Sequence, residues 1–201
     1  MNFITKRIIV ITAGAVISAF GITLALSAGF GGATLAVLWQ GFSKTFGISL
    51  GTSSAVVAVF MILFALVYDK HQINIGTVLY QIFYSGFVEV FSNILTKTNS
   101  PYINILIMLI GIFCFAVGTG IYSSADWGRG SYEAVTFAIA EKNGFQVKNV
   151  RIILDIIVVV IGVTLGGKIG ICTVATVFLS GPIIQFSKSK AEDILFSKVH
   201  R

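Results

Sequence analysis

Two stretches of the chain, Gly14–Gly47 (GAVISAFGITLALSAGFGGATLAVLWQGFSKTFG) and Gly111–Gly144 (GIFCFAVGTGIYSSADWGRGSYEAVTFAIAEKNG), align without a gap at an offset of 97 residues. The matched small residues are Gly14 with Gly111, Gly21 with Gly118, Ser27 with Ser124, Ala28 with Ala125, Gly31 with Gly128 and Gly47 with Gly144. With two one-residue gaps, the match continues to Phe91-Ser92 and Phe186-Ser187. An ordered series of matches at one offset indicates that the chain contains one module twice.

The composition is that of a membrane protein. Hydrophobic residues make up 56% of the sequence, charged residues make up 11%, and the mean hydropathy is +0.93. Soluble domains carry about 25% charged residues, so we expect the lipid bilayer as the main partner, and no nucleic acid. Cys114 and Cys172 lie in apolar segments, and we interpret them as packing residues. We predict no disulfide, metal site or cofactor.

Six apolar stretches are candidates to cross a bilayer, which takes about 20 residues per helix. They are Ile8–Leu26, Ile48–Tyr68, Ile75–Leu95, Tyr102–Tyr122, Ile152–Gly167 (short unless 147–151 extends it) and Ile169–Phe186. We therefore predict an all-α, polytopic membrane protein with six transmembrane helices in a single transmembrane domain. Repeat one covers roughly residues 8–95 and repeat two roughly residues 102–187, and a basic tail follows at residues 188–201.

The basic residues predict the orientation of the spans, because lysine and arginine collect on the cytoplasmic side. With the N-terminus inside, eleven of the 14 basic residues fall in cytoplasmic segments, and the three on the outer side are Lys44, Lys97 and Lys168. We therefore expect both termini in the cytoplasm. We also expect aromatic side chains to anchor the protein at the membrane interfaces, and the candidates are Trp39, Trp127 and Tyr132.

Each repeat contains three predicted spans, an odd number, so the second repeat enters the membrane in the opposite orientation and the repeats are inverted. Between the first and second spans of each repeat lies a segment too short to cross, Gly29–Gly47 and Asp126–Gly144. Each segment predicts a glycine turn, a helix of about three turns beginning at Ala33 or Ser131, and a glycine C-cap. Such a helix either lies in the interface or re-enters the membrane beside a cavity, and both readings are open here.

Three charged residues form the main candidate site. Arg151 and Asp155 are four residues apart and can pair on one helical face, while Glu133 begins the second short helix, where a carboxylate complements the helix dipole. A charge within a span costs about 2.5–3.5 kcal/mol on insertion scales. Together the three either bind a polar substrate or relay protons. The alternative is purely structural, an ion pair and a helix-start carboxylate.

Five further residues complete the set of substrate-binding or proton-coupling candidates. Glu89 interrupts the third span and has no lysine or arginine within four residues, so its partner must come from another helix. The alternative is that Glu89 lies near the outer interface of the membrane. Gln40 and Gln185 supply neutral hydrogen-bonding groups, which bind solute or join helices. Asp126 and Arg129 lie in the glycine turn before the second short helix.

Several strings in the sequence are similar to those of YczE-like bacterial membrane proteins. They are Ala28-Gly29-Phe30-Gly31, Val37-Leu38-Trp39-Gln40-Gly41-Phe42, Ile48-Ser49-Leu50-Gly51-Thr52, Ile75-Gly76-Thr77-Val78, Leu165-Gly166-Gly167 and Ser180-Gly181-Pro182-Ile183-Ile184-Gln185. The resemblance extends from about residue 10 to residue 187. It implies an integral protein of the bacterial cytoplasmic membrane.

The chain departs from this family pattern in repeat one. Similar proteins tend to carry Pro-Trp-Asp before the Val-Leu-x-Gln-Gly string, and this chain has Thr34, Leu35 and Ala36 there. In repeat two, the corresponding acid is retained as Glu133, at the position equivalent to Ala36. The resemblance therefore implies that charged function is concentrated in the second half of the chain.

Motifs of enzymes are missing from the sequence. It contains no His-Glu-x-x-His pair, Gly-x-Ser-x-Gly elbow, Walker sequence or Cys-x-x-Cys pair, so we expect no enzyme. We predict a secondary transporter or exporter of a small polar or amphipathic solute that works by alternating access between the repeats. The alternative is a non-catalytic binding or assembly subunit, similar in size to substrate-capture subunits of vitamin transporters. A homodimer and a partner membrane protein are both open.

Overall fold

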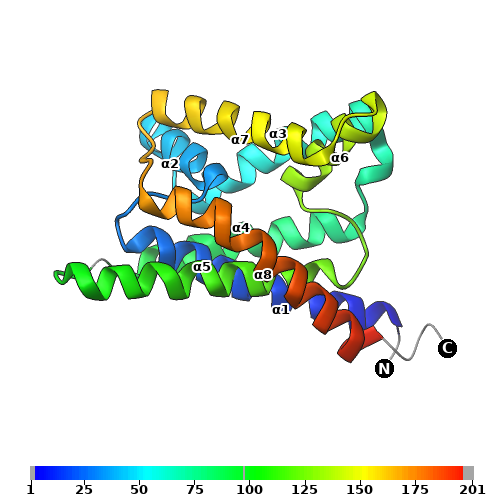
Figure 1. Ribbon diagram of the computed structural model, residues 1–201, viewed down its shortest axis with the longest axis horizontal. Helices are drawn as coiled ribbons and strands as arrows, with labels where there is room; N and C mark the ends of the chain where they lie inside the picture. The colour runs from blue at the N-terminus through cyan, green and yellow to red at the C-terminus, as the bar shows by residue number, and fades with distance from the viewer. Residues whose placement is uncertain (1–2, 97, 197–201) are drawn as a thin grey trace.

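The computed structural model describes residues 3–96 and 98–196, and these residues form α-helices, one 3-10 turn and connecting loops (Figure 1). The elements are α1 (Phe3–Ser27), α2 (Thr34–Phe46), α3 (Leu50–Asp69), η1 (Lys70–Gln72), α4 (Ile75–Ile94), α5 (Pro101–Ser123), α6 (Ser131–Asn143), α7 (Val147–Thr164) and α8 (Ile171–Phe196). The predicted all-α class is confirmed. Lys97 and residues 197–201, which contributed to the predicted orientation and tail, lie outside the described residues.

The helix bounds recur at the offset of 97 residues that the sequence shows. Helix α2 corresponds residue for residue to α6, and α3 begins 97 residues before α7. Both short helices end at a glycine in the left-handed region, Gly47 with φ 65° and Gly144 with φ 67°. Glycine adopts this conformation without steric cost. The predicted pair of short helices with glycine C-caps is therefore confirmed.

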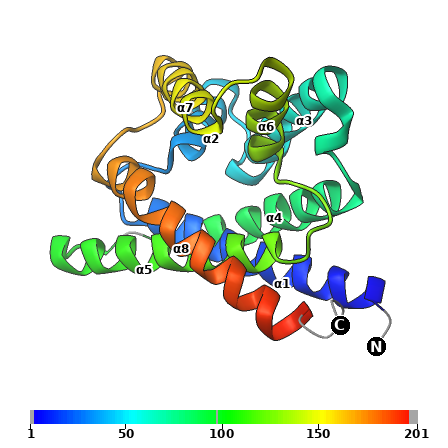
Figure 2. The ribbon, with the colours of Figure 1, turned by 45° about the vertical axis from the view of Figure 1, so that its right-hand side comes forward.

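The eight helices form two layers (Figures 1 and 2). One layer consists of α1, α4, α5 and α8, in which α5 packs against both α1 and α8, and α1 packs against α4. The other consists of α2, α3, α6 and α7, with α2 on α7 and α3 on α6 as the main contacts. Three of these contacts join a helix of repeat one to a helix of repeat two: α1 with α5, α2 with α7, and α3 with α6.

Glycines permit the close approach of α1 and α5. A Cβ atom added to Gly14 would lie 2.6 Å from the backbone N of Tyr122 and 2.8 Å from the carbonyl O of Gly118. A Cβ added to Gly111 would lie 2.8 Å from the carbonyl O of Gly21. The offset of 97 residues turns the pair Gly14–Gly118 into Gly111–Gly21. A contact that maps onto its own partner in this way is the pattern expected of two repeats related by a two-fold axis.

The loops before the short helices follow the same pattern. In repeat one, the carbonyl O of Phe30 accepts a hydrogen bond of 3.0 Å from the backbone N of Cys172, at the start of α8. In repeat two, Trp127 stands 97 residues after Phe30, and its carbonyl O lies against Gly76 at the start of α4. The turn of each repeat is therefore seated on the last helix of the other repeat.

Within the described residues, four helical segments are long and apolar enough to cross a membrane: α1, Leu50–Gln72 (α3 with η1), α5 and α8. The predicted spans Ile75–Leu95 and Ile152–Gly167 correspond to α4 and α7, which are outside this group. Polar residues explain the difference, and they are Gln81, Glu89 and Asn93 in α4 and Lys148, Arg151 and Asp155 in α7. Six spans and their inversion across a bilayer therefore stay predictions.

The two ends of the described chain lie together. Helix α8 continues through Phe196, so the predicted basic tail begins as part of this helix. The ring of Phe196 packs edge-on against that of Phe3 at 6.2 Å, and Lys6 donates to the carbonyl O of Leu195. The start of α1 and the end of α8 therefore share one end of the molecule (Figure 2).

We expect Gly111→Ala to lower the free energy of unfolding by about 1–3 kcal/mol, because the new Cβ would lie 2.5 Å from the backbone N of Ala25. The matched control is Gly86→Ala in α4, where no atom lies within 4 Å of the added Cβ and a better helix former should be neutral or slightly stabilising. Thermal unfolding in detergent measures both. Equal melting temperatures for the two variants would contradict the glycine-mediated crossing.

Candidate functional site

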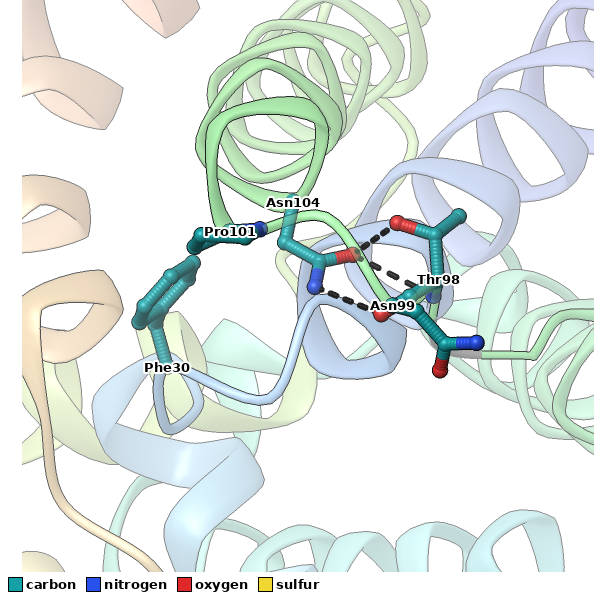
Figure 3. Close-up of a pocket in the computed structure, with 5 residues that line it drawn as sticks. All are labelled: Phe30, Thr98, Asn99, Pro101 and Asn104. Atoms are coloured by element: carbon teal, nitrogen blue, oxygen red, sulfur yellow. Dashed lines mark hydrogen bonds between the residues drawn. The ribbon is translucent and has the colours of Figure 1, made fainter.

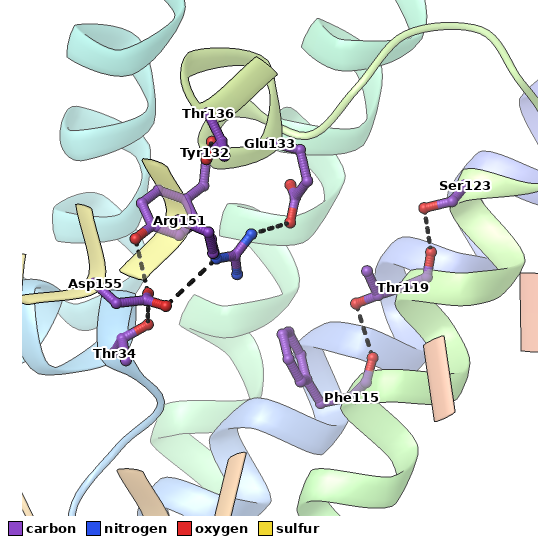
Figure 4. A network of polar contacts seen from close by, with 9 residues as sticks. All are labelled: Thr34, Phe115, Thr119, Ser123, Tyr132, Glu133, Thr136, Arg151 and Asp155. Atoms are coloured by element: carbon purple, nitrogen blue, oxygen red, sulfur yellow. Dashed lines mark hydrogen bonds and ion pairs between the residues drawn. The ribbon is translucent and has the colours of Figure 1, made fainter. Parts of the chain in front are cut away.

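The Asp155 carboxylate on α7 joins the two short helices (Figure 4). Its Oδ1 accepts a hydrogen bond of 2.7 Å from Oγ1 of Thr34, the first residue of α2, and another of 2.7 Å from the hydroxyl of Tyr132, in the first turn of α6. Both hydroxyls come from the first turn of a helix, the end that carries partial positive charge. One acidic group thus connects repeat one with repeat two.

Arg151 lies between two carboxylates. Its Nη1 is 3.4 Å from Oε1 of Glu133, and its Nε is 3.5 Å from Oδ2 of Asp155. Its Cζ also lies 4.3 Å from the ring centre of Tyr132, a cation–π distance. The side chains of Arg151 and Glu133 are 41% and 39% exposed, whereas that of Asp155 is 19% exposed. The charged cluster is therefore anchored at Asp155 and accessible at Glu133 and Arg151.

Local backbone geometry places these groups. The turns before α2 and α6 contain Gly31 with φ 91° and Gly128 with φ 119°, conformations that L side chains rarely adopt. The Glu133 carboxylate folds back over Gly130, where an added Cβ would collide with its Oε2. Burial and the negative charge of Asp155 raise the pKa of the Tyr132 phenol above its ordinary value, so the hydroxyl keeps its proton and donates it in the hydrogen bond.

The equivalent region of repeat one is neutral. Ser54 and Ala58 occupy the positions that correspond to Arg151 and Asp155. The Ser54 hydroxyl lies 3.1 Å from that of Ser85, which accepts a hydrogen bond of 2.7 Å from the amide of Gln81. Ser131, the repeat equivalent of Thr34, donates to Gln81 Oε1 at 3.2 Å. A buried neutral network thus stands where repeat two has charges.

The other predicted site residues lie elsewhere. Glu89 accepts a hydrogen bond of 3.1 Å from the backbone N of Gly51 and so caps the start of α3, and Gln40 accepts one of 3.1 Å from the backbone N of Lys168. Arg129 pairs with Glu141 at 3.6 Å. Asp126 is exposed with φ 44°, and Gln185 is exposed on α8. Of the eight candidates, the structure brings together Glu133, Arg151 and Asp155.

Two members of the site, Thr34 and Tyr132, were not among the predicted site residues. Tyr132 was expected to be an interfacial anchor, which is wrong because it is only 4% exposed. Trp39 is also 4% exposed and packs edge-on against Tyr84 at 5.8 Å, so the same expectation fails for it. Thr34 could have been found from the repeat. It is equivalent to Ser131, which also carries a hydroxyl and directly precedes Tyr132 and Glu133 in the sequence.

A separate hollow lies at the loop before α5 (Figure 3). It has a volume of about 350 Å³ and is lined by Phe30, Thr98, Asn99, Pro101 and Asn104. The Asn104 side chain accepts a hydrogen bond of 2.8 Å from Thr98 Oγ1 and donates one of 2.9 Å to the Thr98 carbonyl O, so its polar groups close the loop. In residues 3–96 and 98–196, no three His, Cys, Asp or Glu side chains are grouped to hold a metal ion.

Apolar helices arranged in two layers, with a small charged cluster among α2, α6 and α7, define a multi-pass membrane protein of the all-α class. The chain belongs to the family described as "Family of unknown function (DUF6198)", whose profile matches residues 5–189. This result agrees with the YczE-like resemblance of the sequence.

Relatives in two bacteria are similar over most of the chain. The uncharacterized membrane protein YczE of Bacillus subtilis is 27% identical over 94% of this chain and 88% of its own length. An uncharacterized protein of Haemophilus influenzae is 28% identical over 81% of this chain and 74% of its own length. The uncharacterized protein YyaS of Bacillus subtilis is 24% identical over 94% of this chain and 95% of its own length. No solved structure matches the chain.

We expect Tyr132→Phe to lower the free energy of unfolding by about 1–3 kcal/mol, because Asp155 loses a buried, charge-assisted hydrogen bond. Tyr102→Phe is the matched control, since Tyr102 is 83% exposed and should change stability by no more than about 0.5 kcal/mol. Thermal unfolding of the purified proteins gives the comparison. If the two variants melt together, the hydrogen bond does not hold α6 to α7.

Proposed function

We propose that this protein is a secondary transporter or exporter of a small polar or amphipathic solute in the bacterial cytoplasmic membrane. In this proposal, six spans form two inverted three-helix repeats, both termini are cytoplasmic, and the repeats rock about a site at Glu133, Arg151 and Asp155. The transport cycle uses no covalent catalysis and no cofactor. The observation that carries the proposal is the Asp155 carboxylate, which is bound at 2.7 Å by the first turn of each short helix.

The contact pattern supports paired repeats. The crossing of α1 and α5 maps onto itself at the offset of 97 residues, and each glycine turn is seated on the last helix of the other repeat. Such mutual contacts between halves recur in transporters with internal repeats, whose substrate sites lie at the repeat interface. The cluster of Thr34, Tyr132 and Asp155 lies at this kind of interface.

The burial of the short helices favours the re-entrant reading over the interfacial one. In α2, the four successive residues from Ala36 to Trp39 are all buried, and positions 100° apart on a helix cover its whole circumference. In α6, burial extends from Ser131 through Thr136 except at Glu133. An interfacial helix buries one apolar face and leaves a polar face in water. A helix enclosed by protein is the kind that membrane proteins tolerate beside a cavity.

The two repeats also differ in a way that alternating access requires. Helix α3 packs against α4, whereas the repeat-equivalent helices α7 and α8 make almost no contact with each other in the described chain. If the repeats exchange these arrangements, the closed side opens and the open side closes. The accessible groups of Glu133 and Arg151 belong to the half in which the helices are apart.

The cluster suggests how a solute binds. Two carboxylates and one guanidinium give a formal charge of −1, and Arg151 sits at 3.4–3.5 Å from both carboxylates. These separations exceed those of strong charge-assisted hydrogen bonds, about 2.7–2.9 Å. A solute with its own polar or charged group can therefore compete for Glu133 or Arg151 while Asp155 stays fixed by Thr34 and Tyr132.

We expect a transported solute to raise the melting temperature of the wild-type protein. Glu133→Gln and Arg151→Ala should each abolish this rise and also abolish uptake of the solute into vesicles that contain the protein. A ligand at a hundred times its dissociation constant stabilises the native state by about 2.7 kcal/mol. The screen covers amino acids, amines, vitamins and fatty acids.

The matched control is the pair Lys188–Glu192, also four residues apart and joined at 3.6 Å. Lys188→Ala and Glu192→Gln should keep both binding and uptake. Uptake that survives neutralisation of Glu133 and Arg151 would contradict the proposal. Protein that binds solute but moves it only after a larger membrane protein is added would favour the alternative, a binding or assembly subunit.

A further inference from the structure

A second cavity lies at the end of α2, against the loop between α7 and α8. Its volume is about 280 Å³, and its lining includes Gln40, Lys44, Lys168 and the glycines Gly29, Gly31 and Gly166. The Lys44 side chain crosses Gly166, where an added Cβ would lie 3.2 Å from its Nζ. None of the groups Glu133, Arg151 or Asp155 lines this cavity, so it is separate from the proposed transport site.

The charges of the cavity are unbalanced. Neither Lys44 nor Lys168 forms an ion pair with a carboxylate in the described residues. Gln40 uses its side-chain oxygen to accept the backbone N of Lys168 at 3.1 Å, which leaves its NH₂ group as a further donor. Two ammonium groups, an amide and glycine backbone therefore surround the same space.

The repeat-equivalent place lies at the end of α6 and against η1, and it carries carboxylates. At the offset of 97 residues, Lys44 corresponds to Glu141 and Gly166 to Asp69. There the Gln72 amide donates to Glu141 at 2.7 Å and to Asp69 at 3.0 Å, and Arg129 lies 3.6 Å from Glu141. The two repeat-equivalent places therefore differ in the sign of their charge, because one carries two carboxylates and the other carries two lysines and no carboxylate among its lining residues.

We infer that this cavity binds a phosphate group, carried either by a lipid headgroup or by a free phosphate. The anion would supply the negative charge that the lining of this cavity lacks, and Lys44 and Lys168 would bind it as ammonium donors. The predicted topology also supports an anion site, because only three lysines are predicted on the outer side of the membrane. Two of them, Lys44 and Lys168, line this same cavity. The inference does not depend on the transport proposal.

To test this inference, the melting temperature of the full-length protein is measured in sodium phosphate and compared with its value in sodium chloride at the same ionic strength. A second arm uses lipid nanodiscs containing phosphatidylglycerol against nanodiscs of phosphatidylcholine alone. We expect a saturable rise in melting temperature in at least one arm, and Lys44→Gln with Lys168→Gln should weaken the apparent affinity about tenfold or more. A rise with phosphate indicates a free anion, and a rise with phosphatidylglycerol alone indicates a headgroup.

Lys148→Gln with Lys190→Gln is the matched control, because it removes the same charge from exposed positions outside the cavity and should respond like wild type. A second variant, Lys44→Glu, introduces the residue type of the equivalent position Glu141. The new carboxylate should pair with Lys168, so the melting temperature without ligand should stay the same. The rise in melting temperature with phosphate or phosphatidylglycerol should be lost. The inference is overturned if wild type responds in neither arm, if the Lys44/Lys168 variant responds like wild type, or if the control loses the response equally.

Discussion

The close approach of α1 and α5 is the constraint on which the rest of the structure depends. Glycines at 14, 21, 111 and 118 let two backbones meet where side chains would collide, as small residues do in membrane helix pairs that lack a hydrophobic driving force. Because this crossing maps onto itself, it sets how the repeats face each other. The turn after each of these helices then reaches the last helix of the other repeat, and the short helices converge from both halves on Asp155.

Divergence between the copies gives the nearly repeated scaffold its polar features. At the centre, repeat two carries Arg151 and Asp155 where repeat one has Ser54 and Ala58. At the ends of the short helices the copies differ again, since one of the two repeat-equivalent places carries Asp69 and Glu141 where the other carries Gly166 and Lys44. A charge held in an apolar chain costs free energy unless it is paired. Arg151 is held between two carboxylates, whereas Lys44 and Lys168 pair with no carboxylate in the described residues. These are the two places where we propose that polar ligands bind.

Much of this architecture follows from the sequence. The offset of 97 residues predicts both short helices and their glycine caps, and the four-residue spacing predicts the Arg151–Asp155 pair, because these are local features. Other outcomes depend on contacts across long stretches of chain. Thr34 reaches Asp155 over 121 residues, Trp39 and Tyr132 become buried rather than interfacial, and Glu89 caps α3 through Gly51. Local periodicity carries no information on which distant element covers a side chain, so these roles could not be predicted from it.

Inverted repeats place equivalent residues on opposite sides of the membrane, and thiol labelling tests this directly. Phe46 and Asn143 are repeat equivalents and the exposed last residues of α2 and α6. Each is replaced by cysteine in a chain whose Cys114 and Cys172 are serine, and intact cells are treated with a membrane-impermeant maleimide. We expect labelling of Phe46→Cys in intact cells and of Asn143→Cys only after permeabilisation. Labelling of both from the same side would contradict the inverted arrangement.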